Sequence, residues 1–184
     1  SRTQFQIGQL LDGRCLLDQV YSTFPRDPEE VSRTMARLLH DLCEIRREMP
    51  AEDWQHFCQD IVPNHELAQV IGQDPFTRHS MMKPRGYAGD AMLLDYIYGL
   101  RNGATTPLGQ QIFYFTTNTP PCRAVRKRAG IIAGIIDRLA EQRNPFRVLS
   151  IACGHLREAE MSRAMRHGKI TEYIALDQDA ESLD

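Results

Sequence analysis

One short stretch of the chain combines the residue types that a nucleotide-binding turn needs. In RVLSIACGHLREAE, residues 147–160, an apolar run leads into Ala152, Cys153 and Gly154, and a polar stretch of helical character follows. Small residues let the backbone approach a ligand closely, and the first N–H groups of a helix point toward the same place. The stretch therefore predicts a ligand site where a strand meets a helix.

An acidic residue, Asp177, follows this turn at about the spacing found in nucleotide-binding α/β folds. Asp177 lies 23 residues beyond Gly154 and directly follows a second apolar run, YIAL at residues 173–176. In doubly wound α/β folds, an acid at the end of the neighbouring strand accepts hydrogen bonds from the ribose hydroxyls of an adenosine-containing cofactor. Together, the turn and the acid predict such a cofactor.

The elements that would position these residues follow from the spacing of apolar side chains. Residues 146–152 predict a buried strand, residues 156–166 a helix and residues 173–176 a second strand. Strand, small-residue turn, helix and strand with a terminal acid make up the first half of a doubly wound sheet.

Helices dominate the first three quarters of the chain. Apolar residues at three- and four-residue spacing predict long helices over 28–49 and 120–140, and shorter ones over 52–61, from 64 and over 92–98. We therefore predict an α/β fold, in which a helical domain precedes the start of a Rossmann-like domain.

The predicted domain boundary lies before the second long helix. Residues 1–118 would form a helical accessory or substrate-cap domain, and residues 119–184 would begin the cofactor-binding domain. The predicted sheet is incomplete at residue 184, and its open strand edges favour association. We therefore expect a homodimer, or pairing with a C-terminal half that completes the sheet.

A second stretch, KPRGYAGD at residues 83–90, is dense in residues with special properties. Its two glycines permit a tight loop, Arg85 offers a planar fork to a carboxylate, and Tyr87 offers a flat ring with a hydroxyl. Asp90 stands at the N-cap of the helix predicted over 92–98. The alternative interpretation is a helix-capping loop with a solvated arginine. We favour a functional role for Arg85 and Tyr87 and leave Asp90 open.

Both stretches resemble known sequences. VLSIACGHLREAE followed by YIALDQDAESL is similar to motif I and the subsequent acid of class I S-adenosylmethionine-dependent methyltransferases. KPRGYAGD is similar to a signature that precedes the methyltransferase domain of a bacterial family, whose members include enzymes that make 3-hydroxy fatty acid methyl ester signals. The resemblance covers roughly residues 74–184. Against the acid and the three alternate glycines of motif I, this chain has Ser150, Ala152, Gly154 and Leu156.

The resemblance implies an enzyme that transfers a methyl group from S-adenosylmethionine to a carboxylate oxygen of a small or fatty-acid substrate. The catalytic residues would be Arg85, which would place the substrate carboxylate, Tyr87, which would close over the methyl group or the cofactor, and Asp90. No metal is implied. The cofactor would be held by Ser150, Ala152, Cys153, Gly154, Glu158, Asp177 and Gln178, with Glu158 near the methionine ammonium.

The acceptor decides whether a base is needed. A carboxylate is already ionised near neutral pH, so alignment and exclusion of water would supply most of the catalysis. An alcohol or amine acceptor would require a general base. Asp90 and His155 are the candidates for that base in this sequence.

Composition excludes several other classes of function. The net charge of −2 and the pI of about 6.3 give no electrostatic case for binding nucleic acid or an anionic membrane. No apolar run reaches the ~18 residues of a membrane span. The 5 cysteines are scattered and never form a C-x-x-C pair, which argues against a disulfide framework or a zinc cluster and indicates a reducing cytoplasm.

Two alternatives to the methyltransferase stay open. One is a helical interaction or regulatory module with a non-catalytic α/β remnant, which would use the helix over 28–49 and a basic cluster as its working surfaces. A solvated helix face is the simpler interpretation of that cluster. The other is an enzyme with a different adenosine cofactor in the same half-site. The basic cluster consists of Arg123, Arg126, Lys127 and Arg128.

Overall fold

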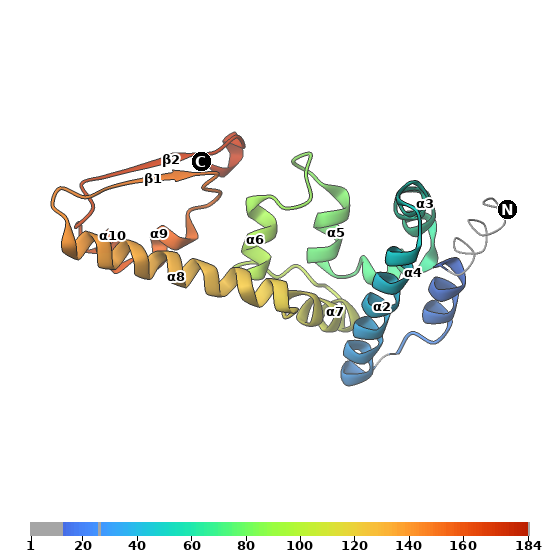
Figure 1. Cartoon of the computed structure of the whole chain (residues 1–184). Coiled ribbons are helices and arrows are strands. Elements are labelled where there is room, and N and C mark those ends of the chain that lie inside the picture. Colours follow the sequence, from blue (N-terminus) through green and yellow to red (C-terminus); the bar gives the residue numbers. More distant parts are fainter. Residues whose placement is uncertain (1–12, 26, 184) are drawn as a thin grey trace. The chain divides into compact units, whose positions relative to one another are not determined.

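The computed structural model describes residues 13–25 and 27–183. This part of the chain is mostly helical and carries a small two-stranded parallel sheet near its C-terminal end (Figure 1). Its contacts form two compact units. The helical unit comprises the residues up to 78 together with 103–116, and the sheet unit comprises 79–102 together with the residues from 117 onward. The domain boundary after residue 118 stays a prediction, and residues 1–12 and Asp184 lie outside the described residues.

The helical unit is a succession of helices. Residues 13–22 are helical, and the elements that follow are α2 (Pro28–Glu48), α3 (Ala51–His56), the π-helical turn η1 (Phe57–Ile61), the 3-10 turn η2 (Val62–Asn64) and α4 (Glu66–Ile71). Two further helices, α5 (Pro75–Met82) and α7 (Pro107–Thr117), continue across the boundary between the units and had no sequence-based prediction.

The helix predicted over 28–49 is confirmed as α2, and two local features explain where it starts. The Asp27 carboxylate caps it by accepting the N–H groups of Glu29 and Glu30, and Pro28 occupies its first position. The helix predicted from Asn64 begins two residues later, because residues 62–64 form a 3-10 turn. The buried face of α2 contributes Val31, Met35 and Leu38 to the cores of this unit.

A buried carboxylate joins α5 to α7 within the helical unit. Asp74 is fully buried and accepts hydrogen bonds from the backbone N–H groups of Phe76 and Thr77, which begin α5. It also accepts a hydrogen bond of 2.9 Å from the Thr116 hydroxyl of α7. Because the charge is fully hydrogen-bonded, its burial is tolerated.

The sheet unit contains both predicted strands and the helices predicted over 92–98 and 120–140, together with a divided helix between the strands and a 3-10 turn that had no sequence-based prediction. They are α6 (Ala91–Ile97), α8 (Pro120–Gln142), β1 (Arg147–Ile151), α9 (Arg157–Met161), α10 (Arg163–Arg166), β2 (Glu172–Leu176) and the 3-10 turn η3 (Ala180–Ser182). The two strands pair in parallel, with Arg147 opposite Glu172 and Ile151 opposite Leu176. Both C-terminal strand ends therefore meet at one edge, where the site is expected.

The single helix predicted over 156–166 is wrong, because the chain breaks it at Ser162. The Ser162 backbone is extended and its hydroxyl caps α10 by accepting the N–H of Met165. The same hydroxyl donates to the Asp137 carboxylate of α8 at 2.7 Å, and the Ala164 N–H donates to it at 2.9 Å. These hydrogen bonds hold the pKa of Asp137 far below its usual value. At this break, the segment that connects β1 to β2 is hydrogen-bonded to α8.

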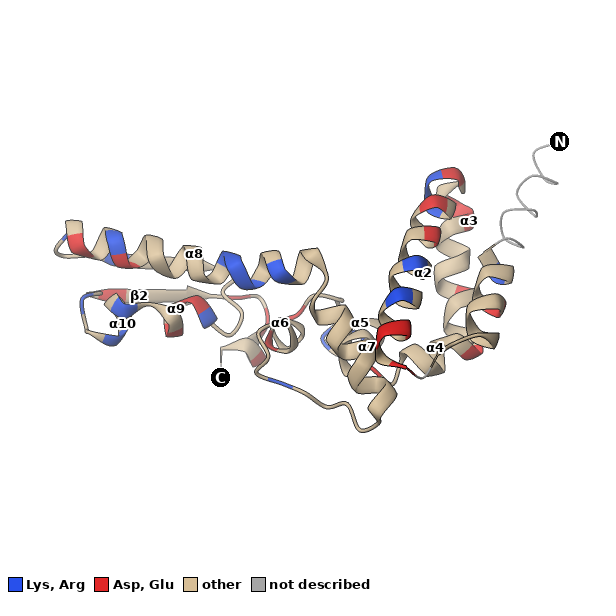
Figure 2. Cartoon of the chain, turned by 90° about the horizontal axis from the view of Figure 1, so that it is seen from below, with Lys and Arg blue, Asp and Glu red and all other residues tan. Residues whose placement is uncertain are grey.

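Helices cover one face of the sheet (Figure 1). Ile136 and Ala140 of α8 pack there with Phe146, Val148 and Ala164. The first half of α8 carries the basic cluster, seen as blue bands in Figure 2. The helix begins at Pro120, as predicted over 120–140, and ends two residues later than predicted, at Gln142.

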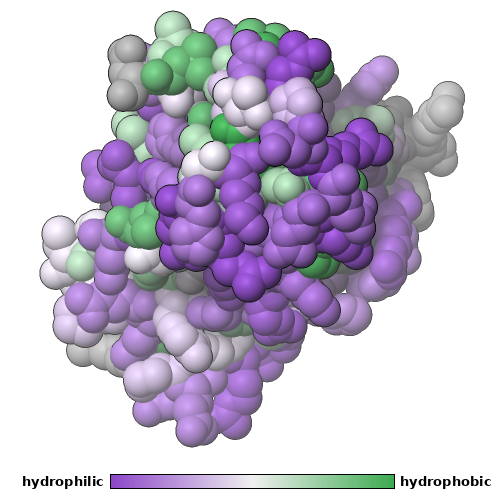
Figure 3. Space-filling view, turned by 90° about the vertical axis from the view of Figure 1, so that its left-hand side faces the viewer, coloured by the Kyte–Doolittle hydropathy of each residue, from purple (hydrophilic) through white to green (hydrophobic). Residues whose placement is uncertain are grey.

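The other face of the sheet is apolar and exposed among the described residues. The prediction of a buried strand is therefore wrong for one face of β1, because the helices of the described chain cover only the opposite face. Figure 3 shows hydrophobic atoms in green along the top of the view onto this end. The exposed apolar residues of the sheet, which we call the bare sheet face, are Leu149, Ile151, Ile174 and Leu176.

None of the helices in the described residues combines the length and hydropathy that a bilayer crossing needs.

Candidate functional site

The turn between β1 and α9 has an alternating backbone conformation. Ala152, Gly154 and Leu156 have φ angles of 55°, 52° and 51°, which place all three in the left-handed region. A residue with a side chain is disfavoured there by about 1–2 kcal/mol. The three positions are those that the resemblance aligns with the glycines of motif I, and the backbone follows a glycine-type path at all three although two of them are alanine and leucine.

We expect Ala152→Gly to raise the free energy of unfolding by about 0.5 kcal/mol. Glycine removes the strain of the positive φ, and this gain exceeds the entropy that glycine adds to the unfolded chain. Ala175→Gly, in the middle of β2, is the matched control. The control has no positive φ to relieve and is expected to lower stability by about 1 kcal/mol. Urea unfolding measures both variants, and destabilisation of equal size in both would contradict the strain argument.

Asp177 lies directly against this turn. Its Oδ2 accepts the Gly154 N–H at 2.7 Å and its Oδ1 accepts the Asp179 N–H at 2.9 Å. The N–H groups of Asp179 and Gly154 lower the pKa of the Asp177 carboxyl, so the side chain is ionised at neutral pH. Each carboxylate oxygen retains capacity to accept a further hydrogen bond.

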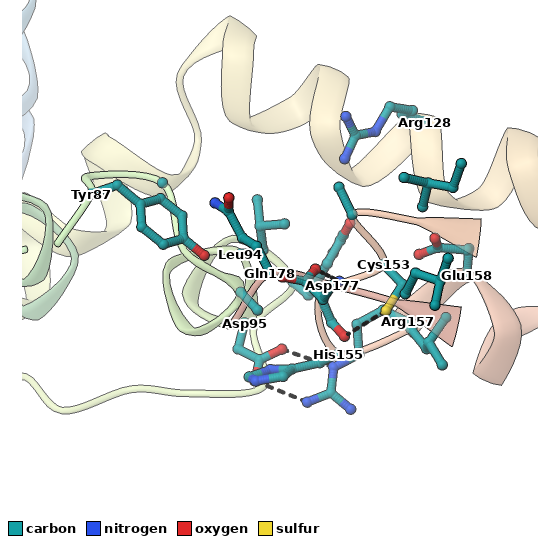
Figure 4. Close-up of a pocket in the computed structure, with 18 residues that line it drawn as sticks. Tyr87, Leu94, Asp95, Arg128, Cys153, His155, Arg157, Glu158, Asp177 and Gln178 are labelled. Carbon is teal, nitrogen blue, oxygen red and sulfur yellow. Dashed lines mark hydrogen bonds and ion pairs between the residues drawn. The ribbon is translucent and has the colours of Figure 1, made fainter. Parts of the chain in front are cut away.

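A cavity of about 450 Å³ opens where the two strands end (Figure 4). Of the residues predicted to form the site, those that line this cavity are Tyr87, Ala152, Cys153, Gly154, Glu158, Asp177 and Gln178. Figure 4 shows Tyr87 at one side of the group and Arg128 and Glu158 at the other, with Asp177 and Gln178 between them.

Two of the cavity-lining side chains are held in their neutral forms at physiological pH. Burial, followed by the charges of Asp179 and Asp177, raises the pKa of the Tyr87 phenol. Burial and the Asp177 carboxylate likewise raise the pKa of the Cys153 thiol. Tyr87 therefore offers a hydroxyl donor, and Cys153 acts as a small buried residue and not as a thiolate.

Three of the predicted site residues do not line the cavity. Ser150 lies within β1, opposite Ala175 of β2. Arg85 instead donates hydrogen bonds from Nη1 to the Asp179 carboxylate and, at 2.9 Å, to the Ser182 hydroxyl. It thus connects the 83–90 loop to the segment after β2, and its charge is matched within the protein. Its role toward a substrate carboxylate stays a prediction.

Asp90 is the third, and its capping role is confirmed. The side chain is 0% exposed, and its Oδ1 accepts the Leu93 N–H at 2.7 Å to cap α6. His79 Nε2 lies 2.8 and 2.7 Å from the two carboxylate oxygens. Sequence reasoning missed His79, because a pair 11 residues apart across a loop has no characteristic spacing.

A buried charge cluster at the cavity wall was also missed. Asp95 of α6 is 2% exposed and accepts hydrogen bonds from Arg157 Nε at 2.8 Å and Nη2 at 2.9 Å. His155 Nδ1 lies 2.9 Å from the same carboxylate. Burial acts to raise the pKa of Asp95, but hydrogen bonds from Arg157 and His155 outweigh it and lower the pKa. These partners are 60 and 62 residues away in sequence, so no local pattern links them.

The cluster orients His155 in the cavity. Asp95 fixes one ring nitrogen of His155, and the imidazole lines the cavity next to Gly154. A histidine held by a carboxylate has the arrangement of a general base. Asp90, the other candidate base, is fully buried and does not line the cavity.

Comparison of the chain with protein-family models, with curated protein sequences and with solved structures gave no match. The case for a function therefore depends on the residues and geometry of the site.

Proposed function

We propose that the sheet unit is the cofactor-binding start of an S-adenosylmethionine-dependent methyltransferase. The observation that carries the proposal is the turn at Ala152, Gly154 and Leu156, whose alternating left-handed residues lie against the ionised Asp177. A backbone open to close approach and a carboxylate at the neighbouring strand end are the two features that an adenosine cofactor requires in a doubly wound sheet. The parallel pairing of β1 and β2 supports the same fold.

The protein residues in this proposal bind, orient and exclude water. Asp177 accepts hydrogen bonds from the ribose hydroxyls, and the Tyr87 phenol covers the cavity from the 83–90 loop. S-adenosylmethionine supplies an electrophilic methyl group on a sulfonium leaving group. The protein's contribution to the transfer is then alignment of the acceptor with that methyl group in a site that excludes water.

The proposed acceptor is a carboxylate oxygen of a small or fatty-acid substrate, as the resemblance implies. Such an acceptor needs no base. Arg85 already pairs with Asp179, so holding a substrate carboxylate would require Arg85 to share its guanidinium. An alcohol or amine acceptor would instead need a general base, and His155, which Asp95 orients, would take that role.

Association and location belong to the same proposal. The bare sheet face and the open strand edges favour a second copy of the chain or a C-terminal half that completes the sheet. We propose a bacterial cytoplasmic enzyme, in which the free cysteines of the described chain stay reduced.

Isothermal titration with four ligands tests the cofactor class. We expect S-adenosylmethionine and S-adenosylhomocysteine to bind with micromolar dissociation constants, and NAD and ATP to bind at least about tenfold more weakly, because the 152–156 turn has neither a dinucleotide nor a Walker phosphate loop. Tighter binding of NAD or ATP would contradict the proposal and favour another adenosine cofactor. Absence of binding by all four ligands would favour the regulatory module.

A further inference from the structure

The 83–90 loop is fixed to the sheet unit at a few side chains. Arg85 and Tyr87 are partly buried and Asp90 is fully buried, while the other positions of the loop are exposed. Gly86, between the arginine and the tyrosine, has a φ of 85°, which glycine adopts without strain. The loop can therefore turn at this glycine and place both neighbouring side chains against the protein.

The Arg85 guanidinium is bound by the segment that follows β2. The side chains of Arg85 and Asp179 are only 9% and 11% exposed. Arg85 Nη1 donates to the Asp179 carboxylate and to the Ser182 hydroxyl, and Nε lies 3.5 Å from the Glu181 carboxylate. Burial acts to raise the pKa of Asp179, but hydrogen bonds from Ser182 and Arg85 outweigh it and lower the pKa. A buried ion pair therefore joins the loop to the end of β2.

The loop also lies between two cavities. Beside the cavity of about 450 Å³ at the strand ends, a second cavity of about 340 Å³ is lined by the loop and the segment after β2. Tyr87 and Gln178 line both cavities, so their side chains form the wall between them. Figure 4 shows the Tyr87 hydroxyl directed toward Asp177 and Gln178. Movement of Tyr87 away from the strand ends would join the two cavities and open the site.

We propose that Arg85 is a positioning residue, which holds the 83–90 loop closed through Asp179 so that Tyr87 gates the cavity. We call the Arg85–Asp179 ion pair the loop latch. The inference rests on the proposed function for what the cavity holds, and it gives Arg85 a role other than binding a substrate carboxylate. Arg85 does not line the cavity at the strand ends. Loss of the latch should therefore accelerate ligand entry and exit together and change the equilibrium affinity far less.

Surface plasmon resonance with S-adenosylhomocysteine measures the two rates. We expect Arg85→Gln to accelerate association and dissociation by about tenfold each, the factor for a lost hydrogen bond between charged groups, and to change the dissociation constant by less than about threefold. Asp179→Asn should act in the same direction. Because both variants break one interaction, the double variant should be no faster than the faster single one. Arg85→Lys keeps the charge without the planar fork and should be intermediate.

A second readout needs no ligand. Chymotrypsin cleaves after tyrosine where the chain can leave the protein surface, so cleavage between Tyr87 and Ala88 reports the open loop. We expect this cleavage to be about tenfold faster in Arg85→Gln. Arg147→Gln is the matched control, because it removes an exposed guanidinium that pairs with Glu172 at 3.6 Å and lines neither cavity. It should change both readouts by less than about twofold.

Two results would overturn the loop latch. One is faster dissociation with unchanged association in Arg85→Gln, which would make Arg85 a ligand contact. The other is cleavage after Tyr87 at the original rate. If the unchanged protein did not bind S-adenosylhomocysteine, the proposed function would fail, and the cleavage rate would still decide the latch. A melting curve for each variant verifies folding, and Arg85→Lys replaces Arg85→Gln if the latter does not fold.

Discussion

Replacing Asp177 by asparagine is expected to lower the affinity for S-adenosylhomocysteine by about 100-fold. The carboxylate would accept two charge-assisted hydrogen bonds from the ribose, each worth about 1.5 kcal/mol. Their loss corresponds to about 3 kcal/mol, or two orders of magnitude in the dissociation constant. The backbone N–H groups of Gly154 and Asp179 hold the carboxylate in place before any ligand arrives, so little entropy is lost in positioning it.

A suitable control variant removes another carboxylate that is hydrogen-bonded within the protein but lies away from the cavity. Asp137 accepts the Ala164 N–H at 2.9 Å, lies in the same unit and does not line the cavity. Asp137→Asn is therefore expected to lower the thermal midpoint while leaving the dissociation constant of the folded protein within about twofold of its original value. Isothermal titration, with a melting curve for each variant, separates binding from stability. Retained affinity in Asp177→Asn would remove the main support for the cofactor site.

The largest effect on stability is expected at Asp95. Asp95→Asn should lower the free energy of unfolding of the sheet unit by about 3 kcal/mol, since breaking a buried ion pair from one side costs Arg157 its buried partner and leaves it with the exposed Glu160. The value lies at the low end of the usual range because Arg157 and His155 are 23% and 17% exposed and can recover some hydration. The new amide N–H groups would also face the guanidinium and the imidazole, which are donors themselves.

Glu160→Gln provides the comparison for Asp95→Asn. Glu160 is bound by the same arginine, Arg157, at 2.7 Å, but its side chain is 60% exposed. Exposed ion pairs contribute little, so this variant should lose less than about 0.5 kcal/mol. Urea unfolding followed by circular dichroism measures both. Similar losses in the two variants would show that burial of Asp95 does not set the strength of the cluster.

Elements with strong local signals could be predicted from the sequence. The apolar spacing that predicted α2 and α8 is local, and both helices were found. The break at Ser162 could not be found, because it depends on Asp137, 25 residues earlier. Burial of β1 was predicted wrongly for one face of the strand, because an apolar run is compatible with a strand that is covered on one face or on both.

The residues of the candidate site likewise fall into those that the sequence could bring together and those whose contacts only the folded chain shows. Gly154 and Asp177 were predicted to be neighbours because parallel pairing brings consecutive strand ends together, and the 2.7 Å hydrogen bond agrees. The pairing of Arg85 with Asp179 spans 94 residues and required the folded chain. The approach of Asp95 to His155 likewise results from the packing of α6 beside the turn, for which no sequence pattern exists.

The bare sheet face has a consequence for the thermodynamics of the chain. Its four apolar side chains are 43–73% exposed in the folded protein, so unfolding transfers less new apolar surface to water than their number suggests. The heat-capacity increment of unfolding scales with that newly exposed apolar surface. The stability of the sheet unit should therefore vary more gently with temperature, over a flatter and broader curve, than that of a unit of equal size whose sheet is covered on both sides.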